Sequence, residues 1–191
     1  MAVISVVGTS GVGKSFLVRQ LAALDCAPGF FEGEEGAIPD EIFKSVFTGS
    51  PLGRFRYFIG AYGKRLEKAR RISEQLKMDC YVDGAVLSAD AILLYECKEY
   101  RDELKKLNDS IRAHEADRIL LLTLSKKKLR EFIAKRARKS EDLEKTFARA
   151  WKIQVCFLKA AKSAKRVLVL DRSKLDFSKE KDLKKVKALL I

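Results

Sequence analysis

The sequence is poor in cysteine, histidine and proline. Its 191 residues include four cysteines, one histidine and three prolines. The cysteines are far apart and have no histidine at zinc-ligand spacing. Neither a disulfide framework nor a zinc site is therefore predicted, and we expect reduced thiols in a cytoplasmic protein. The single histidine, His114, lies in a polar stretch and is expected at the surface rather than in catalysis.

Long hydrophobic runs are absent as well. Even the longest uninterrupted apolar stretches are short, as at Ile119–Leu122, whereas a membrane-spanning helix needs about 20 apolar residues. The amino terminus lacks a basic region followed by a longer apolar stretch and a cleavage site, which argues against a secretory signal. No repeat, low-complexity tract or Gly/Ser linker divides the chain. We therefore expect one domain over residues 1–191, without a membrane partner.

Acidic residues become scarce towards the carboxyl terminus. Residues 1–117 hold 16 basic and 18 acidic side chains, whereas residues 118–191 hold 23 and 8, a net charge of +15. All of the excess positive charge of the chain therefore lies in its last part. Such a split favours anionic partners: nucleotides, nucleic acid or an acidic surface.

Apolar, β-branched runs alternate with stretches of helical period. Strands are predicted at Val3–Val7, around Tyr81–Val82, at Arg118–Leu124, at Arg166–Leu170 and, more weakly, near Gly29–Phe31. Little polar alternation within these runs favours parallel pairing. The predicted fold class is therefore α/β, a parallel sheet with helices on both faces.

Helices are predicted between these strands. After Pro51, apolar residues recur at spacings of three and four as far as Leu76. Residues 86–111 are also mostly helical, with a break allowed inside the stretch. Residues 126–139 and 141–165 form two further predicted helices. The second of these is expected to bury Leu143, Phe147, Trp151 and Leu158.

The most specific motif is a phosphate-binding loop of the form G-x-x-x-x-G-K followed by serine or threonine. It comprises Gly8, Thr9, Ser10, Gly11, Val12, Gly13, Lys14 and Ser15. A predicted strand precedes it and a helical stretch follows it, as the motif requires. Its backbone N–H groups and the helix N-terminus would hold phosphates. Lys14 would reach the β- and γ-phosphates, and the Ser15 hydroxyl would bind Mg²⁺.

A nucleoside triphosphate site does not by itself distinguish a GTPase, a motor ATPase and a small-molecule kinase. The chain has no Asn-Lys-x-Asp motif, which a GTPase would carry for guanine recognition. Large ATPase machines usually need more than 191 residues. The kinases remain.

Three further blocks resemble the deoxynucleoside kinase family, particularly its bacterial branch. The block Phe55-Arg56-Tyr57-Phe58-Ile59-Gly60-Ala61-Tyr62 resembles the W-x-F-x-x-Q-x-Y helix of the nucleoside pocket. Residues 132–141 resemble the lid, whose pattern is roughly R-I-x-x-R-x-R-x-x-E. Residues 167–171 with Leu175-Asp176-Phe177 and Asp182-Leu183 resemble the last strand and the C-terminal helix.

The resemblance implies a P-loop kinase fold with a five-stranded parallel sheet and a helical lid at about residues 126–141. It implies transfer of a phosphate from ATP to a hydroxyl, with ATP and Mg²⁺ as cofactors. Glu32, after the second strand, corresponds to the catalytic base for the nucleoside 5′-hydroxyl, although Glu34 and Glu35 are close enough to be alternatives. Dimers are common in the family, so a homodimer is also expected.

The resemblance also implies roles for the remaining site residues. Asp83 corresponds to the acidic residue that ends the third strand, where it would bind Mg²⁺ together with Ser15 and contact the substrate. Phe55 and Tyr62 correspond to the aromatic wall of the nucleoside pocket. Arg136 and Arg138 of the lid correspond to the cations that close over the transferring phosphate, with Lys135 and Arg130 in support.

Three departures from the family pattern stand out. Gly60 replaces the glutamine that grips the nucleobase, and Phe55 replaces the tryptophan before it, a mild change that keeps stacking possible. Gly84 replaces the arginine that follows the strand-ending acid, and Ala85 removes the hydroxyl after it. Arg54, Arg56 or Arg65 of the long helix could supply the lost charge for a larger or already phosphorylated acceptor. Alternatively, the acceptor site has decayed and ATP binding serves regulation.

The sequence therefore favours a nucleoside-type kinase of unusual specificity. A nucleoside monophosphate kinase, a polynucleotide 5′-hydroxyl kinase and a nucleic-acid-binding P-loop protein stay open as alternatives.

Overall fold

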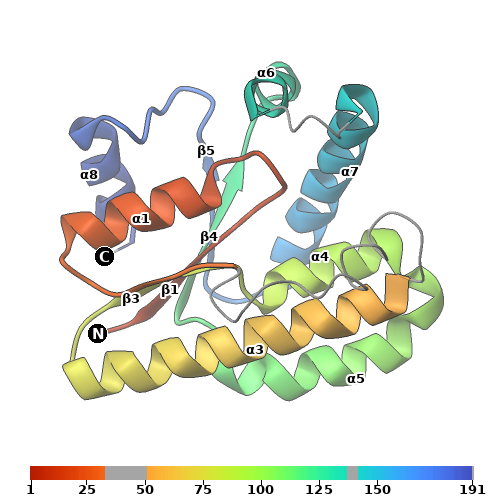
Figure 1. The fold of residues 1–191 in the computed structure, drawn as a ribbon, viewed down its shortest axis with the longest axis horizontal. Coiled ribbons are helices and arrows are strands. Elements are labelled where there is room, and N and C mark those ends of the chain that lie inside the picture. Colours follow the sequence, from red (N-terminus) through yellow and green to blue (C-terminus); the bar gives the residue numbers. More distant parts are fainter. Residues whose placement is uncertain (33–50, 137–141, 191) are drawn as a thin grey trace.

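The computed structural model describes residues 1–32, 51–136 and 142–190, which form a five-stranded sheet with helices around it (Figure 1). All neighbouring strands pair in parallel, in the order β2-β3-β1-β4-β5. The strands are β1 (Val3–Val7), β2 (Gly29–Phe30), β3 (Cys80–Asp83), β4 (Arg118–Thr123) and β5 (Val167–Asp171). The predicted strands and their parallel pairing are confirmed.

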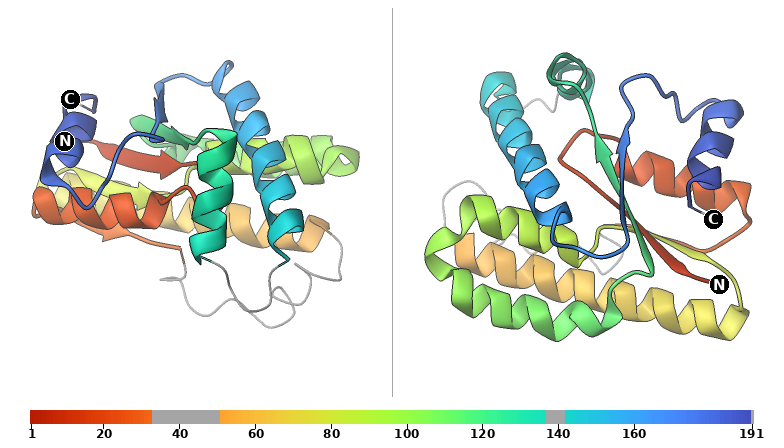
Figure 2. Two further views of the ribbon diagram at one scale, coloured as in Figure 1. Left: turned by 90° about the horizontal axis from the view of Figure 1, so that it is seen from above. Right: turned by 180° about the vertical axis from the view of Figure 1, so that it is seen from behind.

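Helices cover both faces of this sheet, as predicted (Figure 2). They are α1 (Lys14–Leu24), α3 (Pro51–Leu76), α4 (Val86–Glu96), α5 (Arg101–Ile111), α6 (Lys126–Arg136), α7 (Leu143–Ala161) and α8 (Glu180–Ala188), with short 3₁₀ turns at Lys98–Tyr100 and Arg112–His114. Between α4 and α5, the allowed break in residues 86–111 falls at Cys97 and the first of these turns. Helix α5 packs outside α3 and α4.

The central strand β1 is buried on both faces. Ile4 and Val6 pack with α1 and α8, whereas Val3 and Val7 pack with α3 and α4. The strand β5 is more open, and Val169 is 47% exposed. This exposure follows from its place at the end of the strand order, where β4 is its strand neighbour.

Helix α7 buries a different stripe from the predicted one. Its buried residues are Phe147, Ala150, Ile153, Gln154 and Phe157. The expectation for Leu143 and Leu158 was wrong, because these side chains are 37% and 38% exposed. A helix turns 100° per residue, so Leu158 points well away from Phe157 beside it. Trp151 is half-buried at the margin of the stripe.

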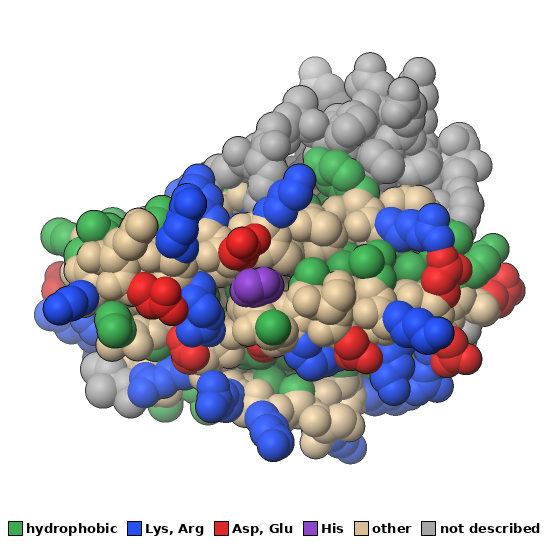
Figure 3. Space-filling model, turned by 90° about the horizontal axis from the view of Figure 1, so that it is seen from below, with side chains coloured by type: hydrophobic (Ala, Val, Ile, Leu, Met, Phe, Trp, Pro, Cys, Tyr) green, Lys and Arg blue, Asp and Glu red, His purple; other side chains and the backbone are tan. Residues whose placement is uncertain are grey.

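The surface below the molecule, on the side of α3 and α5, mixes charges of both signs (Figure 3). His114 lies on this face and is partly buried. All four cysteines are free thiols, and burial raises the pKa of Cys80 to about 11. Among the described helices, none is both long enough and apolar enough to cross a membrane.

Candidate active site

The phosphate-binding loop connects β1 to α1 at the carboxyl edge of the sheet. Gly13 caps α1 in the left-handed conformation, with φ of 92°, and no side chain takes the cap position. The first turn of α1 carries no acidic residue. The N–H groups at the start of the helix therefore face a space suited to an anion, as the motif predicts.

Two contacts support the loop from behind. The Thr9 hydroxyl donates to the carbonyl oxygen of Ala150 at 2.9 Å, which ties the loop to α7. The Arg172 guanidinium donates from Nη1 to the carbonyl oxygen of Val12 at 2.7 Å. A Cβ atom on Gly13 would lie 2.0 Å from that nitrogen, so a larger residue has no room there.

Arg172 itself is held between two aromatic rings. Its guanidinium carbon lies 4.7 Å from the ring centre of Phe132 in α6 and 4.1 Å from that of Phe177. The residue is 6% exposed, and burial lowers its pKa. Sequence reasoning missed this residue, although it directly follows the last strand, where parallel sheets place their functional loops.

The predicted metal-binding pair meets in the structure. The Ser15 hydroxyl donates to a carboxylate oxygen of Asp83, and Asp83 is 2% exposed at the end of β3. A hydroxyl and a carboxylate are hard oxygen ligands, so this pair fits Mg²⁺. Within the described residues no group of three or more His, Cys, Asp or Glu side chains forms a protein cage. The other ligands would therefore be phosphate oxygens and water.

A hollow of about 200 Å³ opens beside the phosphate-binding loop. It brings together Lys14, Glu32, Tyr62 and Asp83, which come from four separate segments. The lining is completed by Gly8, Thr9, Ser10, Phe58, Gly84, Ser88, Ile92, Arg149, Ile153 and Phe157. Predicted phosphate-binding, base and pocket residues thus share one cavity.

Phe55 does not line this cavity. It is 3% exposed and packs in an apolar cluster with Ile59 and Leu93. Phe58 lines the cavity in its place, with its ring centre 6.4 Å from that of Tyr62. Gly60 lies outside the lining, is exposed and would accept a Cβ atom without a contact within 4 Å.

A guanidinium group, that of Arg65 in α3, lies beside Gly84, where the family pattern has an arginine in the sequence. Gly84 has φ of +103°, and a Cβ atom there would lie 2.9 Å from the Tyr62 ring and 3.5 Å from Arg65 Nη1. Arg65 is 3% exposed and donates to the carbonyl oxygen of Asp83. Of the other two arginines considered, Arg56 pairs with Glu103 at the surface, and the side chain of Arg54 lies outside the described part.

Comparison with known proteins gives the same fold. Deoxyadenosine kinase from M. mycoides with bound dATP superposes with a TM-score of 0.72 at 20% identity, over 100% of this chain and 99% of that one. Thymidylate kinase from Candida albicans gives 0.69 at 14%, over 99% and 90%. Thymidylate kinase from Ehrlichia chaffeensis gives 0.64 at 16%, over 99% and 98%.

The fold of the present chain is that of the P-loop nucleoside and nucleotide kinases. No protein-family model and no curated protein matches the sequence. The five-stranded parallel sheet implied by the family resemblance is confirmed.

The predicted lid, at about residues 126–141, includes α6, whereas residues 137–141 lie outside the described part. Arg136 is the last residue of α6, and its side chain lies outside the described part, as do Arg138, Glu34 and Glu35. Arg130 forms an ion pair with Glu144 and lies 5.9 Å from the ring centre of Phe147. Lys135 is exposed.

Arg149 of α7 is a cavity residue that sequence reasoning missed. It lines the cavity and forms an ion pair with Glu96 at 2.5 Å. Its spacing was a usable signal, because Arg149, Ile153 and Phe157 recur every four residues and so share one face of the helix.

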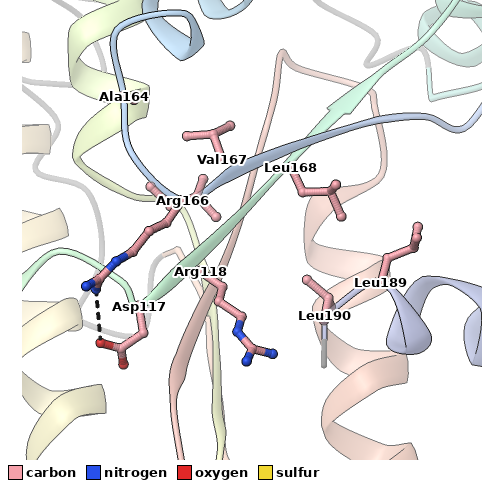
Figure 4. Close-up of a pocket in the computed structure, with 9 residues that line it drawn as sticks. Asp117, Arg118, Ala164, Arg166, Val167, Leu168, Leu189 and Leu190 are labelled. Atoms are coloured by element: carbon pink, nitrogen blue, oxygen red, sulfur yellow. Dashed lines mark ion pairs between the residues drawn. The ribbon is translucent and has the colours of Figure 1, made fainter.

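A second hollow, of about 490 Å³, lies at the opposite edge of the sheet (Figure 4). It sits at the amino ends of β4 and β5, where Arg166 forms an ion pair with Asp117 at 3.9 Å. It includes none of the predicted site residues. The carboxyl edge, where ligands bind in open α/β sheets, therefore holds the candidate site.

Proposed function

We propose that this protein is an ATP-dependent phosphotransferase that moves the γ-phosphate to the 5′-hydroxyl of a nucleoside-type acceptor. The observation that carries the proposal is the cavity in which Lys14, Glu32 and Asp83 meet beside the phosphate-binding loop. Donor and acceptor would lie end to end there, with the reacting atoms between the loop and Glu32.

The donor half of the reaction belongs to the loop. Backbone N–H groups at the start of α1 would hold the β-phosphate, and the Lys14 ammonium would follow the charge that builds on the transferring oxygens. Ser15 and Asp83 would hold Mg²⁺, which when bound neutralises charge on the β- and γ-phosphates. Arg136 and Arg138 of the lid would add positive charge from the other side.

The acceptor half belongs to Glu32 and the aromatic wall. Phe58 and Tyr62 present ring faces on which a nucleobase can stack. The acceptor oxygen bonds to the γ-phosphorus while the bond from that phosphorus to the β–γ bridging oxygen breaks. The acceptor proton passes to the Glu32 carboxylate, and ADP leaves.

A nucleoside monophosphate is the second candidate acceptor, and Arg149 favours it. This arginine brings a permanent positive charge to the cavity, next to the apolar side chains Ile153 and Phe157. A guanidinium fork suits a phosphate better than it suits an uncharged sugar. Thymidylate kinases also occur among the structures that share the fold.

The test is a phosphotransfer assay. The purified chain is incubated with MgATP and a panel of nucleosides and nucleoside monophosphates, and products are identified by mass spectrometry. We expect one acceptor class to be phosphorylated, with loss of activity in Lys14→Ala and full activity in Lys181→Ala, an exposed lysine of α8. Product formation no higher than in Lys14→Ala for every acceptor would contradict the proposal.

Arg149→Ala separates the two acceptor classes. If the acceptor is a monophosphate, we expect its KM to rise by about 10-fold or more, the cost of one charge-assisted pair. The KM for a nucleoside acceptor should change little, because a nucleoside carries no phosphate to pair with Arg149. Activity on nucleosides alone, unaffected by this substitution, would remove the monophosphate candidate.

A further inference from the structure

A long acid-free segment crosses the outer side of the molecule. Residues 145–170 contain seven lysines and arginines and no aspartate or glutamate. Most of this segment is α7, which stands at one side of the molecule in Figure 1 and in the right view of Figure 2. One of these seven cations, Arg149, lines the cavity of the proposed site.

Three of the seven cations form ion pairs with acidic side chains that the structure describes. Lys145 pairs with Asp142 at 3.8 Å, Arg149 with Glu96, and Arg166 with Asp117 at 3.9 Å. Lys152, Lys159 and Lys162 are exposed, and in the described part of the chain no acidic side chain pairs with them. We call these three residues the α7 lysine row.

The row lies on one side of α7, away from the cavity. At 100° per residue, the three lysines fall within about 80° of one another, and they span about 15 Å along the helix axis. Ile153 and Phe157, which line the cavity, lie on the other side of α7. Between the lysines, Val155 is 37% exposed, and the half-buried Trp151 lies on the edge of the same helix side.

Solvated helix faces elsewhere in this protein look different. In α8, Lys184 pairs with Glu180 at 2.6 Å and Lys185 with Asp182 at 3.0 Å. The face on the side of α3 and α5 likewise mixes both signs (Figure 3). Unlike Lys184 and Lys185, the three lysines of the α7 lysine row have no acidic residue to pair with along their own segment, residues 145–170.

We propose that the α7 lysine row binds the sugar–phosphate backbone of nucleic acid. A row of unpaired ammonium groups on one side of a helix suits a polyanion, and lysine serves such contacts as a point charge. Contacts to phosphate carry no sequence information. The binding is therefore independent of sequence and separate from the phosphotransfer cavity.

The test measures binding of a fluorescent 20-base-pair DNA duplex by anisotropy at 50–200 mM NaCl. We expect binding at 50 mM that weakens steeply with salt. The triple variant Lys152→Gln/Lys159→Gln/Lys162→Gln should bind at least about 10-fold more weakly and lower the slope of log K against log salt by about 2–3. Its thermal midpoint and phosphotransfer activity should stay unchanged, which keeps this test independent of the proposed kinase function.

Two controls locate the binding surface. Lys181→Gln/Lys184→Gln/Lys185→Gln removes three exposed charges from α8 and should bind almost as well as the natural sequence. Lys14→Ala, and saturating ATP, should leave binding intact.

The proposal is overturned if the duplex does not bind at 50 mM NaCl, if both triple variants weaken binding equally, or if ATP displaces the duplex. Row-dependent binding of a poly-glutamate peptide without duplex binding would also overturn it, in favour of an acidic protein partner.

Discussion

At the scale of single residues, the site combines a glycine and an arginine in an arrangement that the family pattern does not contain. Gly84 leaves room for the Tyr62 ring, and Arg65 reaches the carbonyl oxygen of Asp83 from α3. The positive charge is therefore kept beside the strand-ending acid while its origin in the sequence changes. A side chain on residue 84 and the present position of Tyr62 exclude each other.

Replacing Gly84 by alanine should destabilise the protein by about 1–3 kcal/mol, because the new Cβ atom meets Tyr62 in a left-handed backbone conformation. Urea unfolding followed by circular dichroism measures the change. Gly60→Ala is the matched control. Its Cβ atom enters open space within α3, so we expect it to raise the free energy of unfolding by about 0.5–1 kcal/mol. Equal effects of the two substitutions would contradict the described turn.

At the scale of elements, α7 connects several parts of the site. Its Ala150 carbonyl holds the Thr9 hydroxyl, and its Arg149 enters the cavity. Gln154, 3% exposed, joins the helix to the end of β4: its Oε1 accepts from the Leu124 N–H at 3.0 Å and its Nε2 donates to the Leu124 carbonyl at 2.9 Å. This amide therefore helps to fix α7 against the end of β4.

Gln154→Glu should lower the free energy of unfolding by about 1–3 kcal/mol or more at pH 7. The carboxylate cannot donate to the Leu124 carbonyl, and it brings a charge into a buried position. Burial would raise the pKa of this carboxyl above its unfolded value, so the lost stability should return as the pH falls below that raised pKa. Urea unfolding at pH 5 and pH 7 measures this. A variant whose deficit is the same at both pH values would contradict the assigned pair of hydrogen bonds.

At the scale of the whole molecule, the positive charge of the last 74 residues divides between different tasks. Arg172 supports the phosphate-binding loop and Arg149 lines the cavity, whereas Lys184 and Lys185 pair with acids of their own helix α8. The α7 lysine row is left without such a task inside the protein. The net charge alone does not tell which cations contact the loop or the cavity, which form ion pairs and which stay unpaired.

Binding of MgATP should stabilise the whole fold, because the loop, β3 and α7 that form its site are linked to the rest of the sheet. At a free concentration 100 times the Kd, the gain is about 2.7 kcal/mol, which corresponds to a rise of about 5–10 °C in the thermal midpoint for a chain of this size. Differential scanning fluorimetry with and without MgATP measures it. Lys14→Ala should show little shift; a shift as large as that of the natural sequence would argue against binding at the loop.

The sequence by itself determined the features that depend on neighbours along the chain. The phosphate-binding loop needs its glycines, lysine and serine at fixed spacing after a buried strand, and β1 lies at the predicted residues, Val3–Val7. The position of the site at the carboxyl edge then follows from a general rule for parallel sheets, whereas the strand order came from the structure. The partnership of Ser15 with Asp83 was reached through the family resemblance and is realised by the pairing of β1 with β3.

Only the tertiary structure decided which side of each helix faces the site. Phe58 rather than Phe55 lines the cavity, Arg65 lies beside Gly84 and contacts Asp83, and Arg172 contacts the loop from near the far end of the chain. The physical reason is that helical periodicity defines an apolar face but not its rotation and height against the sheet. The rotation and height of a helix are set by the packing of many side chains together. For α3 this packing places Phe58, three residues after Phe55, at the cavity.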